Sequence, residues 1–184
     1  MPLRDDTPDT TPNGPIHVLF LCDGNSARSQ IAEAILAKKG GPDFVVASAG
    51  ANPAASVRRE AIEVLRQIGI EWSGHNPKGL ASVAGERWDV VITLCDRTRE
   101  ACPTFPHHPI TAHWGIPDPV MAEDSTRRRA AFFDTVNLLS WRIDLMLSLG
   151  PQGFSRSDFE ERVRGIPFQD QRHAAVQRPD GDPA

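Results

Sequence analysis

The chain has 184 residues, of which 40% are hydrophobic, and a formal net charge of −4 at pH 7. This length fits one domain with a proper core, and no apolar run approaches the length of a membrane span. The acidic balance, without any basic block, argues against nucleic acid as a partner. Residues 1–15 are polar and acidic and lack the basic start and apolar centre of a signal peptide. We therefore expect them to form a disordered tail on a cytoplasmic protein that has no membrane contact.

From residue 16 to residue 149, short apolar runs alternate with helical patterns. Strands are predicted at residues 17–21, 44–48, 90–94 and 110–113, and helices at 30–39, 57–68 and 125–149. Strands that alternate with helical segments predict right-handed crossovers between parallel strands. The expected fold is therefore α/β: a single three-layer domain with a four-stranded parallel sheet and helices on both faces.

The last predicted helix is followed by a Gly-Pro-Gln-Gly segment at residues 150–153, which ends it. Residues 150–184 are mostly polar, with room for a short helix near residues 158–163. We expect a C-terminal tail that is loosely docked or disordered. The predicted organisation is thus a tail at 1–15, a domain at 16–149 and a second tail at 150–184.

The segment after the first predicted strand carries the most specific pattern. Cys22 and Arg28 flank five small or turn-prone residues, and Ser29 follows at the start of a helix. The five residues are Asp23, Gly24, Asn25, Ser26 and Ala27. A strand, a tight loop and a helix together point successive backbone N–H groups inward and place the positive helix end at the loop. Such a loop binds a tetrahedral oxyanion, and the thiol at its base indicates a nucleophile that attacks a phosphate-like centre.

The loop chemistry predicts an activated thiol. Its N–H groups, the helix N-terminus and Arg28 all favour the thiolate, so we expect a lowered pKa for Cys22, with the Ser29 hydroxyl donating to the sulfur. The planar guanidinium of Arg28 can hold two oxyanion oxygens. Gly24 and Asn25 tolerate the left-handed backbone angles that such a loop requires. The alternative is an inert buried cysteine beside an arginine on a solvated helix, which the strand and helix around the loop disfavour.

Cys95 and Cys102 follow the third predicted strand and are seven positions apart. On a continuous helix the rise between them would be about 10.5 Å, whereas a disulfide requires Cα atoms roughly 4.4–6.8 Å apart. A bond between them therefore requires the intervening segment to unwind or loop out. Three interpretations stay open at this point: a redox relay, a zinc site shared with His107, His108 or His113, and two unconnected buried cysteines.

Residues 22–34 resemble the active-site loop of the low-molecular-weight tyrosine phosphatase superfamily. The Asn-Ser-x-Arg-Ser-Gln form of this loop is more similar to the arsenate reductase branch than to the phosphatases, which usually have Cys-Arg-Ser-Pro. Ser48-Ala49-Gly50 fits the end of the family's second strand. Residues 113–119, His-Trp-Gly-Ile-Pro-Asp-Pro, resemble the His-Trp-Gly segment and Asp-Pro of the reductases. The resemblance covers roughly residues 16–149.

This resemblance implies an arsenate reductase, an oxidoreductase of arsenical resistance. Cys22 would attack arsenate, Cys95 would displace arsenite by forming a disulfide with Cys22, and Cys102 would then attack Cys95. Thioredoxin or a similar thiol would reduce the final disulfide, and phosphate and sulfate would compete with arsenate. Asp118, in an Asp-Pro turn after a strand, would be the general acid. His113 and Trp114 are expected to serve packing or hydrogen bonding, and Trp72, Trp88 and Trp141 to be core or partly exposed aromatics.

Two positions depart from the family pattern within the loop. Ala27 replaces a cysteine that many relatives have there, so the relay has to pass through Cys95. Asp23 places a carboxylate beside the anion site, which predicts weaker oxyanion binding or a higher pKa of the thiol.

A third departure concerns the residues that support the loop. Asn25, Glu33 and Ser48 match the potassium ligands of some thioredoxin-linked members, but Lys78 stands where a carboxylate is expected. We expect its ammonium to replace the ion against Glu33, so that the protein requires no potassium. We also expect no other metal site and no cofactor.

Two further functions stay open. Hydrolysis of phosphomonoesters such as phosphotyrosine, through a phosphocysteine, requires only Cys22, Arg28 and Asp118. Residues 119–122 lack the aromatic side chains with which phosphatases commonly hold a phenyl ring, and this favours the reductase. A non-catalytic oxyanion sensor is disfavoured because every catalytic position is intact.

Overall fold

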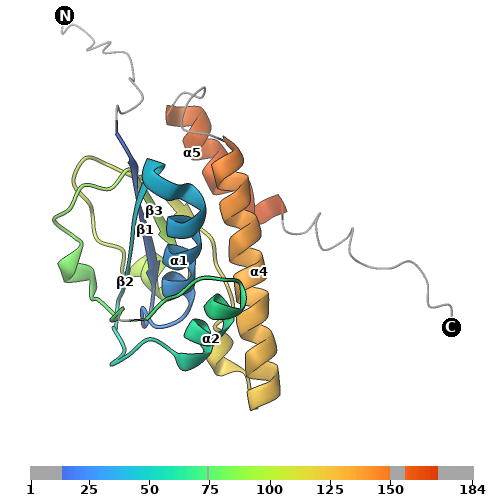
Figure 1. Cartoon of the computed structure of the whole chain (residues 1–184). Coiled ribbons are helices and arrows are strands. Elements are labelled where there is room, and N and C mark those ends of the chain that lie inside the picture. Colours follow the sequence, from blue (N-terminus) through green and yellow to red (C-terminus); the bar gives the residue numbers. More distant parts are fainter. Residues whose placement is uncertain (1–13, 74, 150–155, 170–184) are drawn as a thin grey trace, which may run out of the picture.

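The computed structural model describes residues 14–73, 75–149 and 156–169 (Figure 1). Nearly all of the predicted N-terminal tail therefore lies outside the described residues. The same holds for residues 150–155 and 170–184 of the predicted C-terminal tail. No helix in the described part of the chain is long and apolar enough to cross a membrane.

Four parallel strands form one sheet in the order β2-β1-β3-β4. They are β1 (Ile16–Cys22), β2 (Phe44–Gly50), β3 (Val90–Thr93) and β4 (Ile110–His113). The register pairs Cys22 with Gly50 and Thr93 with His113, so the carboxyl ends of the strands meet at one edge. The predicted four-stranded parallel sheet of an α/β domain is confirmed.

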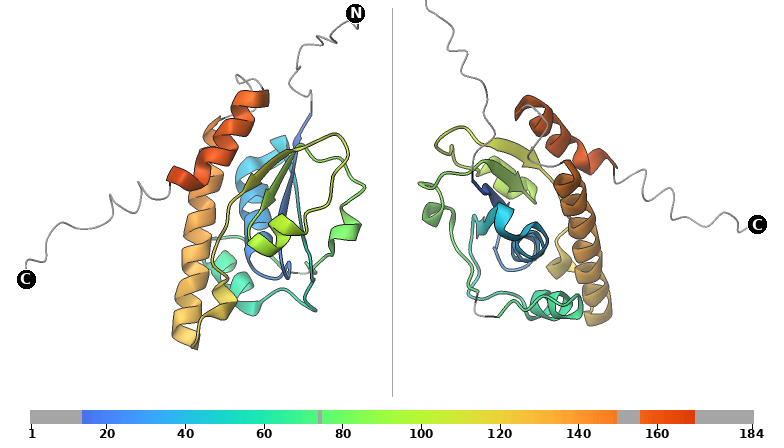
Figure 2. Two further views of the ribbon diagram at one scale, coloured as in Figure 1. Left: turned by 180° about the vertical axis from the view of Figure 1, so that it is seen from behind. Right: turned by 45° about the horizontal axis from the view of Figure 1, so that its top comes forward.

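Three helices gather on one face of the sheet. They are α1 (Arg28–Gly40), α2 (Arg59–Gln67) and α4 (Ser125–Leu149), and α4 packs against both α1 and α2. On the other side, Figure 2 shows only short turns and loops, among them α3 (Asp96–Glu100) and the 3-10 turn η2 (Leu80–Ser82). Further 3-10 turns are η1 (Gly41–Asp43), η3 (Pro119–Met121) and η4 (Ile166–Gln169).

Successive side chains of β1 point to opposite faces of the sheet and contribute to a hydrophobic core on each face. Val18 and Phe20 of β1 belong to the larger core beneath the long helices, whereas Leu19 and Leu21 belong to a smaller core on the opposite face. All four are fully buried. A strand that is buried on both faces reads as a continuous apolar run, because successive side chains point to opposite sides.

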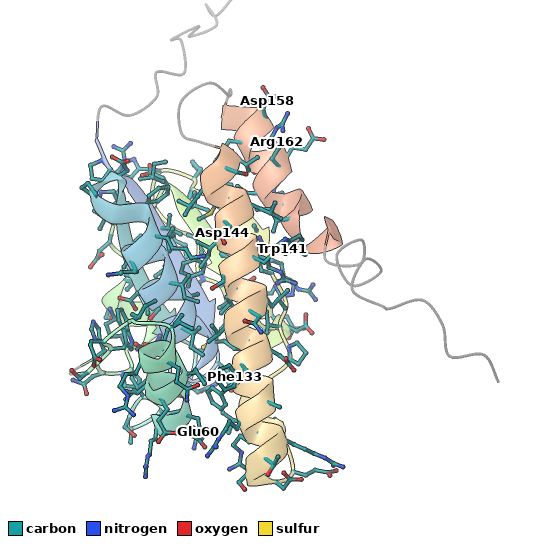
Figure 3. All side chains as sticks on the ribbon, turned by 45° about the vertical axis from the view of Figure 1, so that its right-hand side comes forward. Glu60, Phe133, Trp141, Asp144, Asp158 and Arg162 are labelled. Atoms are coloured by element: carbon teal, nitrogen blue, oxygen red, sulfur yellow. The ribbon has the colours of Figure 1, made fainter. Side chains whose placement is uncertain are left out.

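The helix α5 (Arg156–Gly165) packs beside β4 and α4. Val163 and Ile166 are buried in the larger core, and the indole N–H of Trp114 donates to the carbonyl of Val163 at 3.1 Å. Figure 3 shows Asp158 and Arg162 on this helix, where both line a hollow together with Leu145 of α4. Residues 156–169 thus pack against the domain more closely than we expected from their polar composition. A few apolar side chains anchor a helix that is otherwise charged.

Candidate active site

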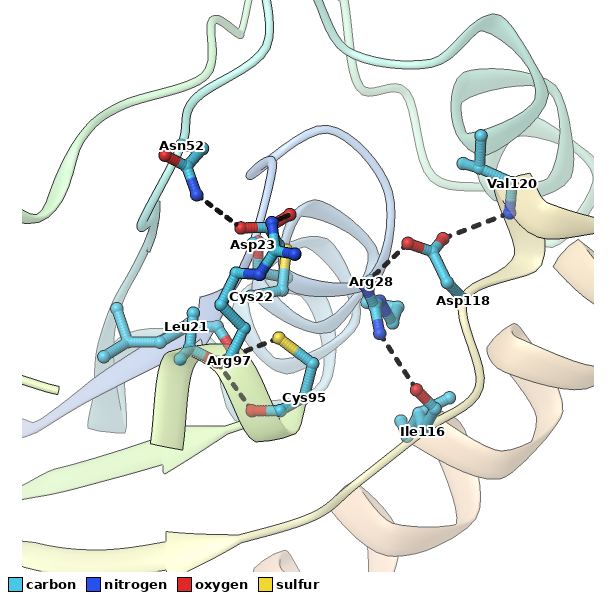
Figure 4. A network of polar contacts seen from close by, with 12 residues as sticks. Leu21, Cys22, Asp23, Arg28, Asn52, Cys95, Arg97, Ile116, Asp118 and Val120 are labelled. Atoms are coloured by element: carbon cyan, nitrogen blue, oxygen red, sulfur yellow. Dashed lines mark hydrogen bonds and ion pairs between the residues drawn. The ribbon is translucent and has the colours of Figure 1, made fainter. Parts of the chain in front are cut away.

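The site forms where β1 and β3 end (Figure 4). Cys22 is the last residue of β1, and the oxyanion-binding loop, residues 23–29, leads from it into α1. Cys95 follows β3 and is the N-cap of α3, while Asp118 follows β4 and is the N-cap of η3. The sheet thus brings all three to its carboxyl edge, where ligands bind in parallel α/β folds.

Cys22 is almost completely buried, with 2% of its surface exposed, and its Sγ lies 2.9 Å from Ser29 Oγ. Burial raises the pKa of the Cys22 thiol, while hydrogen bonds from Ser29, the charge of Arg28 and the backbone of Asn25 lower it less strongly. The predicted lowering of this pKa is therefore wrong. The loop contacts favour the thiolate as expected, but the sulfur ends a buried strand and the loss of hydration outweighs them.

Asn25 organises the inside of the loop from a left-handed backbone conformation, with φ at +46°. Its Nδ2 donates to Ser29 Oγ at 2.8 Å and to Ser48 Oγ at 2.7 Å. Since Ser29 Oγ accepts from Asn25, its own hydrogen is free to point at the sulfur of Cys22. Gly24, which we also expected to need left-handed angles, does not have a positive φ.

A chain of hydrogen bonds reaches Asn25 from the far side. Its Oδ1 accepts from the backbone N–H of Lys78 at 2.7 Å and from Gln30 Nε2 at 3.3 Å. Trp72 Nε1 in turn donates to Gln30 Oε1 at 2.8 Å, and the Trp72 ring stacks on His75. The indole is thus linked to the nucleophile by four successive hydrogen bonds through the side chains of Gln30, Asn25 and Ser29, a role that the sequence analysis missed.

The outer side of the loop is bound by the segment that follows β2. The carbonyls of Cys22, Asp23, Gly24 and Ser26 accept from the N–H groups of Ala51, Asn52, Ala54 and Arg58. Fixing the carbonyls outward is the arrangement that lets loop N–H groups face an anion. Gly50 allows this close approach, since a Cβ there would lie only 2.5 Å from the carbonyl oxygen of Asp23.

Arg28 and Asp118 meet at the mouth of the loop. Arg28 is 6% exposed, and its Nη2 lies 2.8 Å from Asp118 Oδ2, while Nη1 donates to the carbonyl of Ile116 at 3.0 Å. Asp118 Oδ1 accepts from the backbone N–H of Val120 at 3.1 Å. The sequence predicted both functional groups, and the structure joins them by a direct ion pair.

The predicted support residues lie behind the loop. Ser48 Oγ donates to Glu33 Oε2 at 2.5 Å. Burial raises the pKa of Glu33, whereas the bond from Ser48 and the charges of Lys78 and His75 oppose this rise. Lys78 forms no ion pair with Glu33, so its charge acts on this carboxylate from a greater distance than we expected, while its backbone N–H contacts the loop directly.

Cys95 is held at the start of α3. Its Sγ lies 3.1 Å from the hydroxyl of Thr98, which is fully buried and also lies 3.4 Å from the carbonyl oxygen of Leu21. Through Thr98, the first turn of α3 is attached to the end of β1, next to Cys22. This attachment places Cys95 beside the nucleophile's strand.

Cys102 lies beyond the other end of α3. It packs against the smaller core, whereas Cys95 packs against the larger one. Cys102, Arg99 and His113 line a hollow of about 630 Å³, and burial raises the pKa of the Cys102 thiol. All three cysteines are thiols. Among the described residues, no group of three or more His, Cys, Asp or Glu side chains is arranged to hold a metal ion.

Asp23 makes two contacts that the sequence did not indicate. Its Oδ1 accepts from Asn52 Nδ2 at 2.8 Å, and its Oδ2 lies 3.1 Å from Arg97 Nη1 (Figure 4). The carboxylate that we predicted to disturb the anion site therefore carries a cationic partner from α3.

His113 and Trp114 have the structural roles that we expected. His113 Nδ1 lies 2.8 Å from Thr93 Oγ1, and burial lowers the pKa of the imidazole. Trp114 is fully buried in the larger core.

Comparison with known proteins agrees with this geometry. The sequence profile of the family described as low molecular weight phosphotyrosine protein phosphatase matches residues 17–144. Two curated relatives that carry the name arsenate reductase, from Bacillus subtilis and Bacillus licheniformis, are 34% and 37% identical over 119 residues. Each alignment covers 65% of this chain and 85% of the relative.

Solved structures show the same fold. A thioredoxin-dependent arsenate reductase from Corynebacterium glutamicum is 28% identical with a TM-score of 0.57, over 76% of this chain and 63% of that protein. This chain thus spans less than two thirds of that reductase. A low molecular weight protein tyrosine phosphatase from T. tengcongensis is 26% identical with a TM-score of 0.59, over 73% of this chain and 99% of that protein.

Proposed function

The chain belongs to the low molecular weight phosphotyrosine protein phosphatase family, and we propose that its activity is the reduction of arsenate to arsenite. The observation that carries this proposal is that Cys95 and Cys102 flank α3, whose first turn contacts the loop that follows Cys22. Phosphoester hydrolysis requires one thiol, whereas a two-electron reduction requires a second one. The relatives named arsenate reductase support this assignment.

In the first step, the Cys22 thiolate attacks the arsenic atom of arsenate held by the loop. Ser29 donates to the sulfur, and Arg28 and the loop N–H groups bind the oxyanion oxygens. An S–As bond forms and one oxygen leaves as water after it receives protons. Asp118 is next to Arg28 and is the carboxyl group placed to supply a proton.

In the second step, the Cys95 thiolate attacks Cys22 Sγ. The S–As electron pair stays on arsenic, which is thereby reduced from As(V) to As(III) and leaves as arsenite. The two sulfurs are oxidised to a Cys22–Cys95 disulfide, so the electrons balance. Thr98 keeps Cys95 close to the end of β1 for this attack.

In the third step, the Cys102 thiolate attacks Cys95 Sγ, and Cys22 leaves as a thiolate. Cys95 and Cys102 face opposite cores, so α3 has to unwind before their sulfurs can bond. A thiol reductant such as thioredoxin then reduces the Cys95–Cys102 disulfide. The hollow beside Cys102 gives such a reductant an approach from the face without long helices.

Phosphomonoester hydrolysis is the second candidate. The ion pair of Arg28 with Asp118 beside a buried Cys22 provides an oxyanion clamp, an acid and a nucleophile. These three groups suffice for a phosphocysteine intermediate and its hydrolysis.

The deciding experiment compares the wild type with Cys95→Ser and Cys102→Ser in two assays: arsenate turnover coupled to thioredoxin, and hydrolysis of an aryl phosphate. A reductase loses arsenate turnover in both variants and keeps any slow phosphatase activity. Cys102→Ser should also release one arsenite and stop at the Cys22–Cys95 disulfide, which peptide mapping detects. Fast phosphate release by a wild type that does not reduce arsenate would overturn the proposal in favour of the phosphatase.

A further inference from the structure

The ion pair between Asp23 and Arg97 connects the two segments that carry the reacting thiols. Asp23 is the residue after Cys22, and Arg97 is two residues after Cys95. The carboxylate and the guanidinium are 3.1 Å apart and join the oxyanion-binding loop to the first turn of α3. Figure 4 shows the Arg97 side chain extending from α3 to Asp23.

The helix α3 needs such contacts because it has only five residues. A helix of this length is unstable by itself, since nucleation costs more than so few hydrogen bonds return. On the loop side, Thr98 is fully buried against β1, whereas the side chain of Arg97 is 67% exposed. The contact made by Arg97 is therefore the one that water and salt can break most easily.

The same ion pair changes the charge beside the anion site. Asp23 is the first residue of the loop that would receive a negatively charged substrate, and by itself its carboxylate would repel that substrate. Arg97 neutralises this charge, and Asn52 donates a hydrogen bond to the other carboxylate oxygen. The Asp23 carboxylate is thus held from two sides.

We propose that Arg97 is a positioning residue that acts through Asp23. Its ion pair holds α3, and with it Cys95, against the oxyanion-binding loop while the Cys22–Cys95 disulfide forms, and it opens when α3 unwinds for the attack of Cys102. This inference rests on the proposed function. The contact is weak enough for this purpose, since exposed ion pairs contribute only about 0.2–1 kcal/mol.

The test uses Cys102→Ser protein, in which the reaction stops at the first disulfide. Arg97→Ala, Asp23→Asn and the double variant are compared in that background by the rate of Cys22–Cys95 formation at saturating arsenate. Each single variant should slow the step about two- to five-fold. The double variant should be no slower than either one, because all three remove the same pair. Arg97→Ala should also raise the arsenate concentration for half-saturation, and the added Asp23→Asn should restore it.

Arg99→Ala is the matched control, because Arg99 lies on the same turn but pairs with Asp96 within the helix. In the Cys102→Ser background it should form the disulfide at the rate of the parent. High salt should lower the rate of the parent to that of Arg97→Ala and leave the rate of Arg97→Ala unchanged, which a loss of helix structure alone would not produce.

A parallel measurement with diamide, which oxidises two thiols to a disulfide without arsenate, separates the two proposals. If arsenate gives no disulfide in the Cys102→Ser parent, the proposed function fails and diamide still reports the effect of the ion pair. Equal diamide rates in Arg97→Ala and its parent would overturn the inference. So would an equal slowing by Arg99→Ala, or effects of Arg97→Ala and Asp23→Asn that multiply in the double variant.

Discussion

The hydroxyl of Ser29 and the sulfur of Cys22 are 2.9 Å apart, with Asn25 donating to the same hydroxyl oxygen from behind. The direction of this bond follows, because a hydroxyl whose oxygen accepts from an amide turns its hydrogen to the remaining partner. Ser29 therefore stabilises the thiolate of Cys22 more than the thiol. Its effect opposes the burial that raises the pKa of Cys22.

Ser29→Ala should therefore raise the pKa of Cys22 further. Because the thiolate fraction grows as pH rises through the pKa, alkylation of Cys22 by iodoacetamide should slow about ten-fold at neutral pH, from the lost charged hydrogen bond, and recover at alkaline pH. The pH profile of the alkylation rate measures this shift. Ser148→Ala, which removes an exposed hydroxyl bonded to Leu145, is the control and should leave the profile unchanged. An unshifted Ser29→Ala profile would contradict the assigned direction of the bond.

The hydrogen-bond chain from Trp72 gives a second prediction. Trp72→Phe removes the N–H that orients Gln30, so Asn25 loses part of its support and Cys22 alkylation should slow by about two- to ten-fold at neutral pH. Trp88→Phe is the matched control, because its indole N–H donates to the Val83 carbonyl in the smaller core. Both variants should lose a similar amount of stability in urea unfolding, and only the first should change the alkylation rate. Equal alkylation rates would mean that the chain does not reach Cys22.

The contrast between Ser29 and Trp72 shows what the sequence could and could not predict. Strands buried on both faces read as apolar runs, and residues 22–29 are contiguous, so the sheet, the loop and the placement of Ser29 followed from local patterns. Trp72 lies 42 residues from Gln30, and Arg97 lies 74 residues from Asp23. Nothing in the sequence pairs them. The direction of the Cys22 pKa shift required the burial of its strand, which only packing reveals.

Asp118 should act as the general acid of the first step. Asp118→Asn keeps an oxygen for Arg28 but cannot release a proton, so kcat for arsenate should fall about 10²- to 10⁴-fold with a smaller change in KM. Steady-state kinetics measure both constants. Asp124→Asn alters an exposed carboxylate at the start of α4 and should leave them unchanged. An unchanged kcat in Asp118→Asn would exclude this residue as the acid.

The charge of Lys78 in the surroundings of Glu33 predicts independence from potassium. Turnover should stay the same when sodium replaces potassium, because the Lys78 ammonium already acts on the Glu33 carboxylate. Lys78→Ala keeps the hydrogen bond from the backbone N–H of residue 78 to Asn25 Oδ1 and removes only the side-chain charge. The pKa of Glu33 should therefore rise further. Lys39→Ala, which removes an ammonium paired with Asp144, is the control and should leave the pKa of Glu33 unchanged. A collapse of wild-type turnover in sodium would refute this prediction.

The docking of α5 and η4 predicts that the segment after residue 155 stabilises the domain. Ile166 is 1% exposed in the larger core, so Ile166→Ala should lower the free energy of unfolding by about 2–5 kcal/mol, and Ile166→Val by about 0.5–1.5 kcal/mol. Urea unfolding at constant pH measures both. Glu161→Ala on the exposed side of α5 should change stability by less than about 0.5 kcal/mol. If Ile166→Ala unfolds like the wild type, this segment does not belong to the cooperative unit, and the domain ends near residue 149 as the sequence predicted.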